Sequence, residues 1–477
     1  MKKNSEKCLI LFMALSLVLT TSTVFATPVT AYQSTQTSPQ AKYTVIILVD
    51  GMRTEDINVT NTPNIWQLME IGVAADFATT VLPSVTFAAI PSLVTGAYPD
   101  THGVPGKYYD KQLNIKVEFD LPEEFNGTWR EEYLEAQTIF EQAKEYGLKT
   151  AAITGYMVGV VSGKGADILI EPARVQYYTV RGFPWDYEIL PIPEWFKEIL
   201  AGTYYYFPPH PIRWHEGYFW DPDEWLTNAS LSVLENFMPN VLFLHLPMLD
   251  LWQHFYGPGT PIAIDTLKHA DEQIGRVVDK LEELGIYEQT TVFLTSDHGF
   301  TKVIKYADLE TPLKDAGIEY IIANNGGSVH FYFTTLEDKL KAWYVLWSVE
   351  GVEKVIPREL AWFRHLDHLR AGDLIVFLEE GYSAVPYVMG MHGSQELTDV
   401  RIPVIMAGAG IKVGVTIPFA RIIDIVPTAC YLLDIPAPAQ AEGCVLWLAL
   451  KWGSADVETT EALVAAHVQR SLDLPKC

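Results

Sequence analysis

Three short, almost uninterrupted apolar segments restrict what this 477-residue chain can fold into, because an aspartate follows each of them. The segments are Tyr43–Val49, Val241–Leu246 and Thr291–Thr295, and the aspartates are Asp50, Asp250 and Asp297. Strands that are apolar on both faces are typical of parallel sheets covered by helices on both sides. In such sheets functional groups lie beyond the carboxyl ends of the strands. We therefore expect all three aspartates at that edge of one sheet.

Helical patterns alternate with the apolar segments. Thr62 and Pro63 mark the start of a helix that ends at Gly72, and Thr138 with Glu141 matches a capping box. Apolar residues recur at helical spacing from Ile264 to Leu281. This alternation predicts an α/β fold: a doubly wound, mostly parallel sheet with helices on both faces.

Five segments make up the predicted domain organisation. Residues 1–26 have three lysines, an apolar stretch and small residues before Thr27, which indicates a secretory signal peptide; an uncleaved membrane anchor is the alternative. Residues 27–41 form a polar linker, and residues 42–477 form the catalytic domain. Within it we expect an aromatic-rich insertion at 173–229 and a small α+β cap at 302–385. We expect no transmembrane helix in the mature chain, and a secreted, periplasmic or extracellular location.

Charge and composition exclude several classes of protein. Hydrophobic residues make up 49% of the chain, which excludes a disordered polymer. Asp and Glu total 59 against 34 Lys and Arg, and the net charge is −25. A nucleic-acid polymer is not an expected partner, because binding to phosphate backbones requires clustered cations. A small phosphate ester held by metal ions stays compatible with this charge.

Cys430 and Cys444 form either a disulfide or two buried thiols.

Six residues have metal-ligand character and follow strands or lie in glycine-containing loops. They are Asp50, Asp250, His254, Asp297, His298 and His392. Any one of them alone could be a turn residue or a hydrogen-bonded structural histidine. Together, three carboxylates and three imidazoles suffice for two divalent metal ions with open positions, and a set without thiolates suits catalytic zinc.

Thr86 is the candidate nucleophile. It precedes an apolar, helix-like run from Ala88 to Thr95. A hydroxyl at a helix N-terminus faces the positive end of the dipole and free amides, which favour an alkoxide and a bound phosphate. Metal coordination would lower its pKa further. The alternative is that Thr86 only caps this helix.

Six motifs occur in the order found in type I phosphodiesterases/nucleotide pyrophosphatases, of the alkaline phosphatase superfamily. The motifs are Val49-Asp50-Gly51, Pro83-Ser84-Val85-Thr86-Phe87, Val94 to Gly103, Asp250 to Pro258, Ser296-Asp297-His298-Gly299 and His392-Gly393. The chain resembles that family from about Tyr43 to Leu446.

The resemblance implies a two-zinc phosphohydrolase. One zinc would be held by Asp250, His254 and His392. The other would be held by Asp50, Asp297 and His298. Thr86, which also contacts metal, would attack phosphorus and form a phosphothreonine intermediate, cleaving phosphodiester or nucleotide pyrophosphate bonds.

Lys107 departs from the family pattern, which commonly has an asparagine there that hydrogen-bonds a phosphate oxygen. A lysine suits a more highly charged phosphoryl group, so a phosphomonoesterase or phosphonate hydrolase is an alternative function. Lys107 could instead point to solvent, and Lys164 is a weaker second candidate. A phosphoryl-substituent transferase acting on an envelope lipid or glycan is a further alternative.

The predicted insertion at 173–229 is dense in aromatic residues and proline, as Tyr204 to Pro209 illustrate. It could be a platform for a base, sugar or lipid group. The alternative is a small aromatic core that holds an irregular segment together.

Overall fold

The computed structural model describes residues 40–117, 133–155, 163–170 and 222–451. The predicted signal peptide, most of the linker and most of the aromatic-rich insertion lie outside these residues. No helix in the described ranges combines the length and apolar character needed to cross a membrane.

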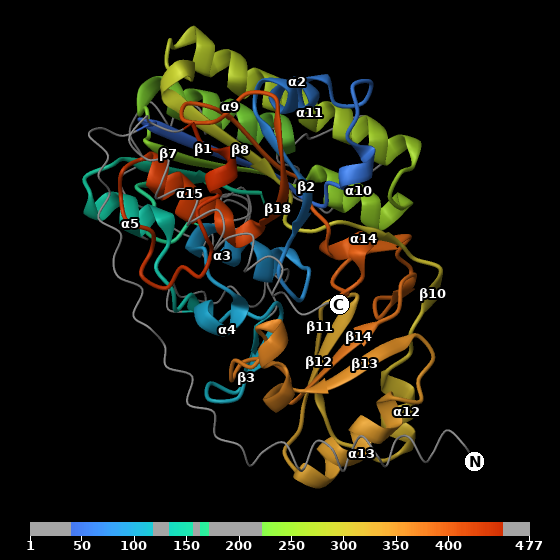
Figure 1. Ribbon diagram of the computed structural model, residues 1–477. Helices are drawn as coiled ribbons and strands as arrows, with labels where there is room; N and C mark the ends of the chain where they lie inside the picture. The colour runs from blue at the N-terminus through green and yellow to red at the C-terminus, as the bar shows by residue number, and fades with distance from the viewer. Residues whose placement is uncertain (1–39, 118–132, 156–162, 171–221, 452–477) are drawn as a thin grey trace, which may run out of the picture. The chain divides into compact units, whose positions relative to one another are not determined.

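An eight-stranded sheet is the centre of the fold (Figure 1). In spatial order its strands are β18 (Val415–Arg421), β2 (Val73–Thr79), β17 (Val404–Gly408), β8 (Thr290–Thr295), β1 (Tyr43–Val49), β7 (Val241–Leu246), β5 (Thr150–Ile153) and β6 (Ile168–Ile170). All neighbours pair in parallel except β17, which is antiparallel to both β2 and β8. The predicted mostly parallel α/β fold is confirmed.

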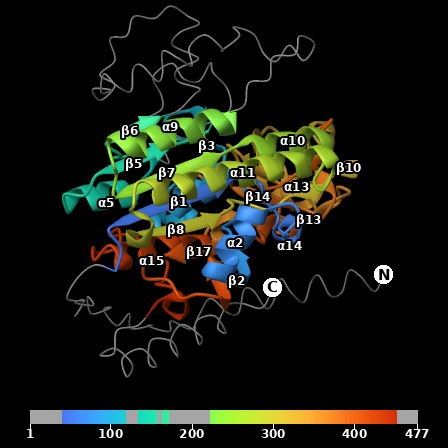
Figure 2. The ribbon, with the colours of Figure 1, turned by 90° about the horizontal axis from the view of Figure 1, so that it is seen from above.

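Every residue of β1 and β7 is buried, because alternate side chains enter two separate cores. Ile46 and Leu48 belong to one core, and Val45, Ile47 and Val49 to the other. The first core is covered by α3 (Thr86–Thr95), α5 (Ile139–Glu145) and α15 (Ile425–Leu432). The second is covered by α2 (Pro63–Ile71), α9 (Pro222–Asn236) and α11 (Pro261–Glu283), and Figure 2 shows α9 and α11 along the strands.

The helices begin where the capping residues predict. Thr138 Oγ1 accepts a hydrogen bond from the Glu141 amide, and the Glu141 carboxylate accepts one from the Thr138 amide, so the capping box is formed. Helix α2 begins at Pro63 and ends at Ile71, before Gly72.

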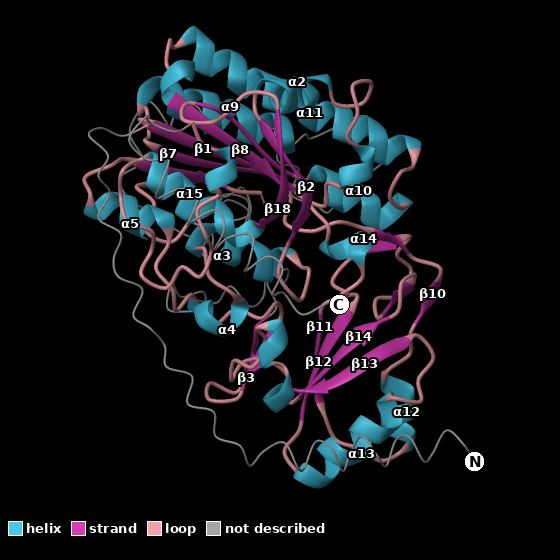
Figure 3. Ribbon diagram, in the orientation of Figure 1, coloured by secondary structure: helices cyan, strands magenta, loops and turns pink. Residues whose placement is uncertain are grey.

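A separate antiparallel sheet lies between β8 and β17 in the sequence (Figure 3). Its spatial order is β11 (Ile321–Asn324), β12 (Ser328–Tyr332), β14 (Leu374–Leu378) and β13 (Val352–Pro357). Helices α12 (Glu310–Asp315) and α13 (Leu336–Leu346) belong to the same segment. We call this α+β segment the cap.

The described residues also contain several short helices and strands. They are α4 (Pro99–His102), α10 (Met248–Tyr256), α14 (Leu397–Val400), the hairpin β3 (Tyr108–Asp110) and β4 (Ile115–Val117), and the strand pairs β9 (Thr301–Lys302) with β16 (Gly390–Met391) and β10 (Lys305–Tyr306) with β15 (Tyr382–Ser383). Cys430 is a buried thiol on α15, and no disulfide joins it to Cys444. Burial raises the pKa of Cys430.

Candidate active site

The six predicted ligand residues converge beyond the carboxyl ends of β1, β7 and β8. Asp50 follows β1 directly, and Asp297 and His298 lie just past β8. Asp250 and His254 are one turn apart on α10, and their side chains approach to 3.4 Å. His392 arrives from the loop after β16. The register of the parallel strands therefore brings residues more than 240 positions apart into one site.

Two overlapping groups of ligand atoms form at this place. Asp50, Asp297 and His298 make one group, and Asp250, His298 and His392 make the other, with all atoms of a group within 4.8 Å of one another. His298 Nε2 lies 3.3 Å from both Asp50 Oδ1 and Asp297 Oδ2. Asp250 Oδ1 lies 3.4 Å from the Nε2 atoms of His254 and His392. His298 thus lies at the junction of the two groups.

Backbone carbonyls orient all three imidazoles. The Nδ1 atoms of His254, His298 and His392 lie 2.9–3.1 Å from the carbonyl oxygens of Gly390, Gly299 and Ser84, respectively. A carbonyl can only accept, so each Nδ1 carries a proton and donates it. Each Nε2 therefore faces the site, as in histidines that ligate metals.

The carboxylates also fit divalent ions, because one oxygen of each lacks a hydrogen-bond partner. Asp50 Oδ1, Asp250 Oδ1 and Asp297 Oδ2 are buried, and none of them has a hydrogen-bond partner. These are the three oxygens that face the histidine Nε2 atoms. Buried carboxylate oxygens are costly without a partner. A divalent cation in each group would supply one.

Mutual repulsion and burial shift the protonation of this cluster. Burial, followed by the charge of Asp50, raises the pKa of Asp297 to about 7. Burial opposes the charged form of His298, but Asp297 and Asp50 outweigh it and raise the pKa to about 10. Protons thus offset the excess negative charge. Metal binding would replace them and release protons.

His245 belongs to the site, although the sequence did not single it out. It is buried in β7, and its Nε2 lies 2.8 Å from Asp50 Oδ2. Burial opposes its charged form, yet the hydrogen bond with Asp50 raises its pKa. It fixes one oxygen of Asp50 and leaves the other facing His298. The only sequence signal was a histidine inside the apolar run of β7.

Thr86 lies at the first position of α3, and Val85 is the N-cap residue without a side-chain capping bond. Thr86 does not therefore act as the cap of this helix. Its Oγ1 instead lies 3.2 Å from His298 Nε2, at the junction of the two ligand groups. The positive end of the α3 dipole therefore lies beside Thr86, which favours a negatively charged phosphoryl group here.

Lys107 is held through its backbone by the cap. Its amide donates to Asn325 Oδ1 at 2.7 Å, and its carbonyl accepts from Asn325 Nδ2 at 3.2 Å. The ammonium lies 6.0 Å from the ring centroid of Phe87, the residue after Thr86. The Lys164 ammonium donates to the Leu134 carbonyl at 3.1 Å and lies 3.5 Å from the Glu141 carboxylate.

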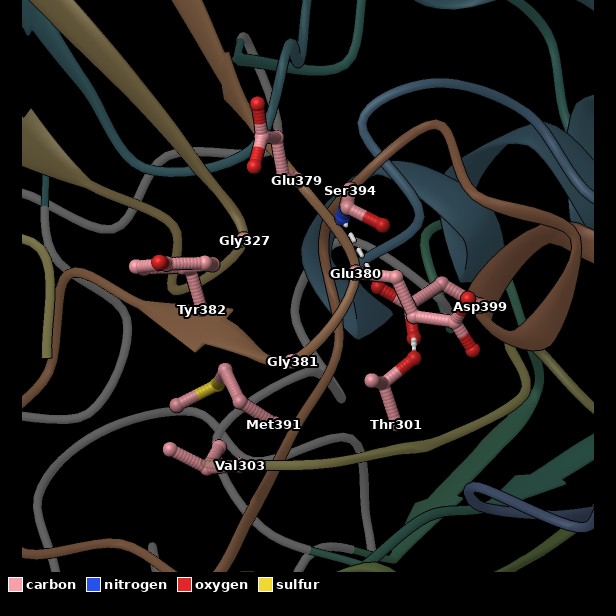
Figure 4. Close-up of a pocket in the computed structure, with 10 residues that line it drawn as sticks. All are labelled: Thr301, Val303, Gly327, Glu379, Glu380, Gly381, Tyr382, Met391, Ser394 and Asp399. Carbon is pink, nitrogen blue, oxygen red and sulfur yellow. Dashed lines mark hydrogen bonds between the residues drawn. The ribbon is translucent and has the colours of Figure 1, made fainter. Parts of the chain in front are cut away.

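A pocket lies on the cap side of the His392 loop (Figure 4). Met391 and Ser394 line it, together with Thr301 and Asp399. Asp399 accepts hydrogen bonds from the Ser394 amide and the Thr301 hydroxyl, at 3.0 and 2.6 Å. None of the six ligand residues lines this pocket. The hydrogen bond from Ser394 to Asp399 holds the loop that carries His392.

Comparison with known proteins gives the family. Residues 44–395 match the family described as type I phosphodiesterase/nucleotide pyrophosphatase. The chain belongs to this family. The match includes every predicted ligand residue and Thr86, and members of the family depend on metal ions.

Curated relatives and solved structures agree with this placement. Human ectonucleotide pyrophosphatase/phosphodiesterase family member 1 is 25% identical over 261 residues, which are 54% of this chain and 23% of that protein. The chain thus spans about a quarter of the length of this relative. Mouse bis(5'-adenosyl)-triphosphatase is 23% identical, covering 85% of this chain and 81% of that protein.

A solved structure of murine ectonucleotide pyrophosphatase/phosphodiesterase 5 shares the fold. Its TM-score is 0.63 at 17% identity, covering 83% of this chain and 96% of the other. That structure is of an inactive threonine-to-alanine variant in complex with AMP.

Proposed function

We propose that this protein is a metal-dependent hydrolase that cleaves phosphodiester or nucleotide pyrophosphate bonds through a phosphothreonine on Thr86. The observation that carries the proposal is the position of Thr86 Oγ1, 3.2 Å from His298 Nε2 and at the N-terminus of α3. A hydroxyl placed where two metal-ligand groups meet is suited to in-line attack on a bound phosphoryl group. The relatives reported above are named as nucleotide pyrophosphatases/phosphodiesterases, which supports a phosphodiester or pyrophosphate bond as the one cleaved.

Two divalent ions, zinc by the chemistry of the donors, would be held in the two ligand groups. Asp50, Asp297 and His298 would hold one. Asp250 and His392 of the second group would hold the other together with His254, whose Nε2 lies 3.4 Å from Asp250 Oδ1. When bound, such ions polarise the phosphoryl group and lower the pKa of a coordinated hydroxyl.

The chain's own residues then account for the two steps. Thr86 Oγ1 loses its proton to solvent and forms a bond to phosphorus, while the bond from phosphorus to the leaving oxygen breaks. The positive end of the α3 dipole stabilises the negative charge on the non-bridging oxygens. Water then attacks phosphorus and regenerates the Thr86 hydroxyl. Asn325 keeps the Lys107 backbone in place beside Phe87 throughout.

Lys107 favours one second candidate, a phosphomonoesterase or phosphonate hydrolase. A full positive charge at this position would stabilise a dianionic phosphoryl group better than a monoanionic diester. The test compares hydrolysis of a bis-aryl phosphate with that of a mono-aryl phosphate, with and without a chelator. Preference for the monoester would replace the diesterase proposal, and activity that survives exhaustive metal removal would contradict both.

Thr86→Ala tests the nucleophile, and Thr86→Ser is the matched control. We expect the alanine variant to lose turnover while its metal content stays close to wild type. The serine variant keeps a hydroxyl and should retain measurable turnover. Substantial activity in the alanine variant would leave Thr86 without a chemical role.

We also propose that the chain is exported to the periplasm or the extracellular space, with residues 1–26 removed. The lysines and apolar stretch of this segment support the proposal. Residues 42–477 would then be the catalytic domain, with insertions at 173–229 and 302–385. N-terminal sequencing of the exported protein should begin at Thr27, and an intact Met1 would contradict cleavage.

A further inference from the structure

A third group of potential ligand atoms lies apart from the active site. It consists of Asp100 on α4, His365 in the cap and Glu442 in the segment after α15. One ligand atom from each residue lies within 4.8 Å of the other two. The three residues span more than 340 positions of the sequence, so only the folded chain brings them together. The proposed catalytic function uses none of them.

The polar atoms of this group are incompletely paired. Asp100 Oδ2 lies 3.2 Å from His365 Nδ1, but Asp100 Oδ1 is buried and has no hydrogen-bond partner. Among the described residues, neither Asp100 nor Glu442 forms an ion pair with a lysine or arginine. With His365 neutral, the group carries two negative charges. A divalent cation would balance both and would give Asp100 Oδ1 a partner.

Tyr98 contacts both His365 and Glu442 and holds them in place. Its ring stacks on the His365 imidazole with centroids 3.6 Å apart and planes 3° from parallel. Its amide donates to Glu442 Oε2 at 2.9 Å, and its hydroxyl accepts from Arg421 at 3.1 Å. The Asp100 amide also donates to the His365 carbonyl at 3.1 Å. The donors are therefore fixed before any ion arrives, which lowers the entropic cost of binding.

We propose that Asp100, His365 and Glu442 bind one divalent transition-metal ion, Zn²⁺ or Mn²⁺, that joins the cap to the main sheet domain. Two carboxylates and one imidazole, without a thiolate, suit these ions. Asp100 and His365 are partly exposed and Glu442 is exposed, so water completes the coordination. Because the cap also holds Lys107 through Asn325, this ion stabilises the contact between the cap and the active-site domain.

The test uses the purified full-length protein, stripped with a chelator and reloaded with Zn²⁺ or, separately, Mn²⁺. Elemental analysis should find one fewer equivalent of metal in Glu442→Gln and in His365→Asn than in wild type. Glutamine keeps an acceptor for the Tyr98 amide. Asparagine tolerates the left-handed backbone of His365, whose φ is 55°, so both variants should fold. Neither residue touches the proposed active site, so turnover should be unchanged with the active-site ions bound.

Thermal unfolding gives the second measurement. Reloading should raise the melting temperature of the wild type more than that of either variant. The difference in this shift should be the same when all three proteins also carry Thr86→Ala. This background separates the proposal from the proposed function, because it lacks the nucleophile but keeps both active-site ligand groups. Unchanged metal content together with an unchanged melting shift in both variants would overturn the proposal, and Asp100 and His365 would then form a hydrogen bond only.

Discussion

Asn325 connects the cap to the active-site region through hydrogen bonds to Lys107. The side chain is buried, with 5% exposure, and makes two hydrogen bonds to the backbone of Lys107. Asn325→Ala removes both hydrogen bonds to the part-buried Lys107 backbone. Each lost hydrogen bond costs about 1 kcal/mol net. We expect the free energy of unfolding to fall by roughly 2 kcal/mol and, because Lys107 is no longer positioned, kcat/KM to fall about tenfold.

Asn324→Ala is the matched control. Asn324 is the same amide one residue earlier and makes two hydrogen bonds, from Nδ2 to the Ala384 carbonyl and from the Gly326 amide to Oδ1. Neither bond reaches Lys107. Denaturant unfolding should therefore show a loss of stability in both variants, whereas steady-state kinetics should show a loss only in Asn325→Ala. Equal kinetics in the two variants would refute a positioning role for Asn325.

Three further predictions concern specificity, metal affinity and pH. Lys107→Asn should reduce turnover of a mono-aryl phosphate more than that of a bis-aryl phosphate, and an equal loss on both would contradict a preference of Lys107 for the dianionic phosphoryl group. His245→Leu should weaken metal affinity about 10–100-fold, because Asp50 loses its hydrogen-bond donor. His245→Gln can still donate a hydrogen bond to Asp50 and should lose less affinity. Competition with a chelator measures both affinities. Burial lowers the pKa of His330 to about 3 from 6.5, so only the unfolded state gains its proton as the pH falls below 6.5. The free energy of unfolding should then fall by about 2 kcal/mol between pH 6.5 and 5, and His330→Leu should lose that share of the acid sensitivity in denaturant titrations.

The strand ends of the active site could be predicted from the sequence. Asp50 and Asp297 follow apolar runs, and parallel strands align their carboxyl ends, so their proximity follows from the fold class alone. His254 and Asp250 are four residues apart, which places them on one face of a helix. These arguments need only local patterns and the rule for parallel sheets.

Other parts of the site depend on register and on contacts across the chain. His245 meets Asp50 because β7 pairs with β1 so that His245 is opposite Leu48, and no periodicity in the sequence sets that register. Asn325 reaches Lys107 across 218 positions. The role of Thr86 as cap or nucleophile was open as well, because the sequence does not show that the helix begins one residue after Val85.

The stereochemical course at phosphorus tests the proposed mechanism most directly. A chiral thiophosphate diester is hydrolysed in water labelled with a heavy oxygen isotope, and the configuration of the product is determined. Attack by Thr86 followed by attack of water gives two in-line displacements, and therefore net retention. Net inversion would mean that water attacks the substrate directly, and it would contradict a phosphothreonine intermediate on Thr86.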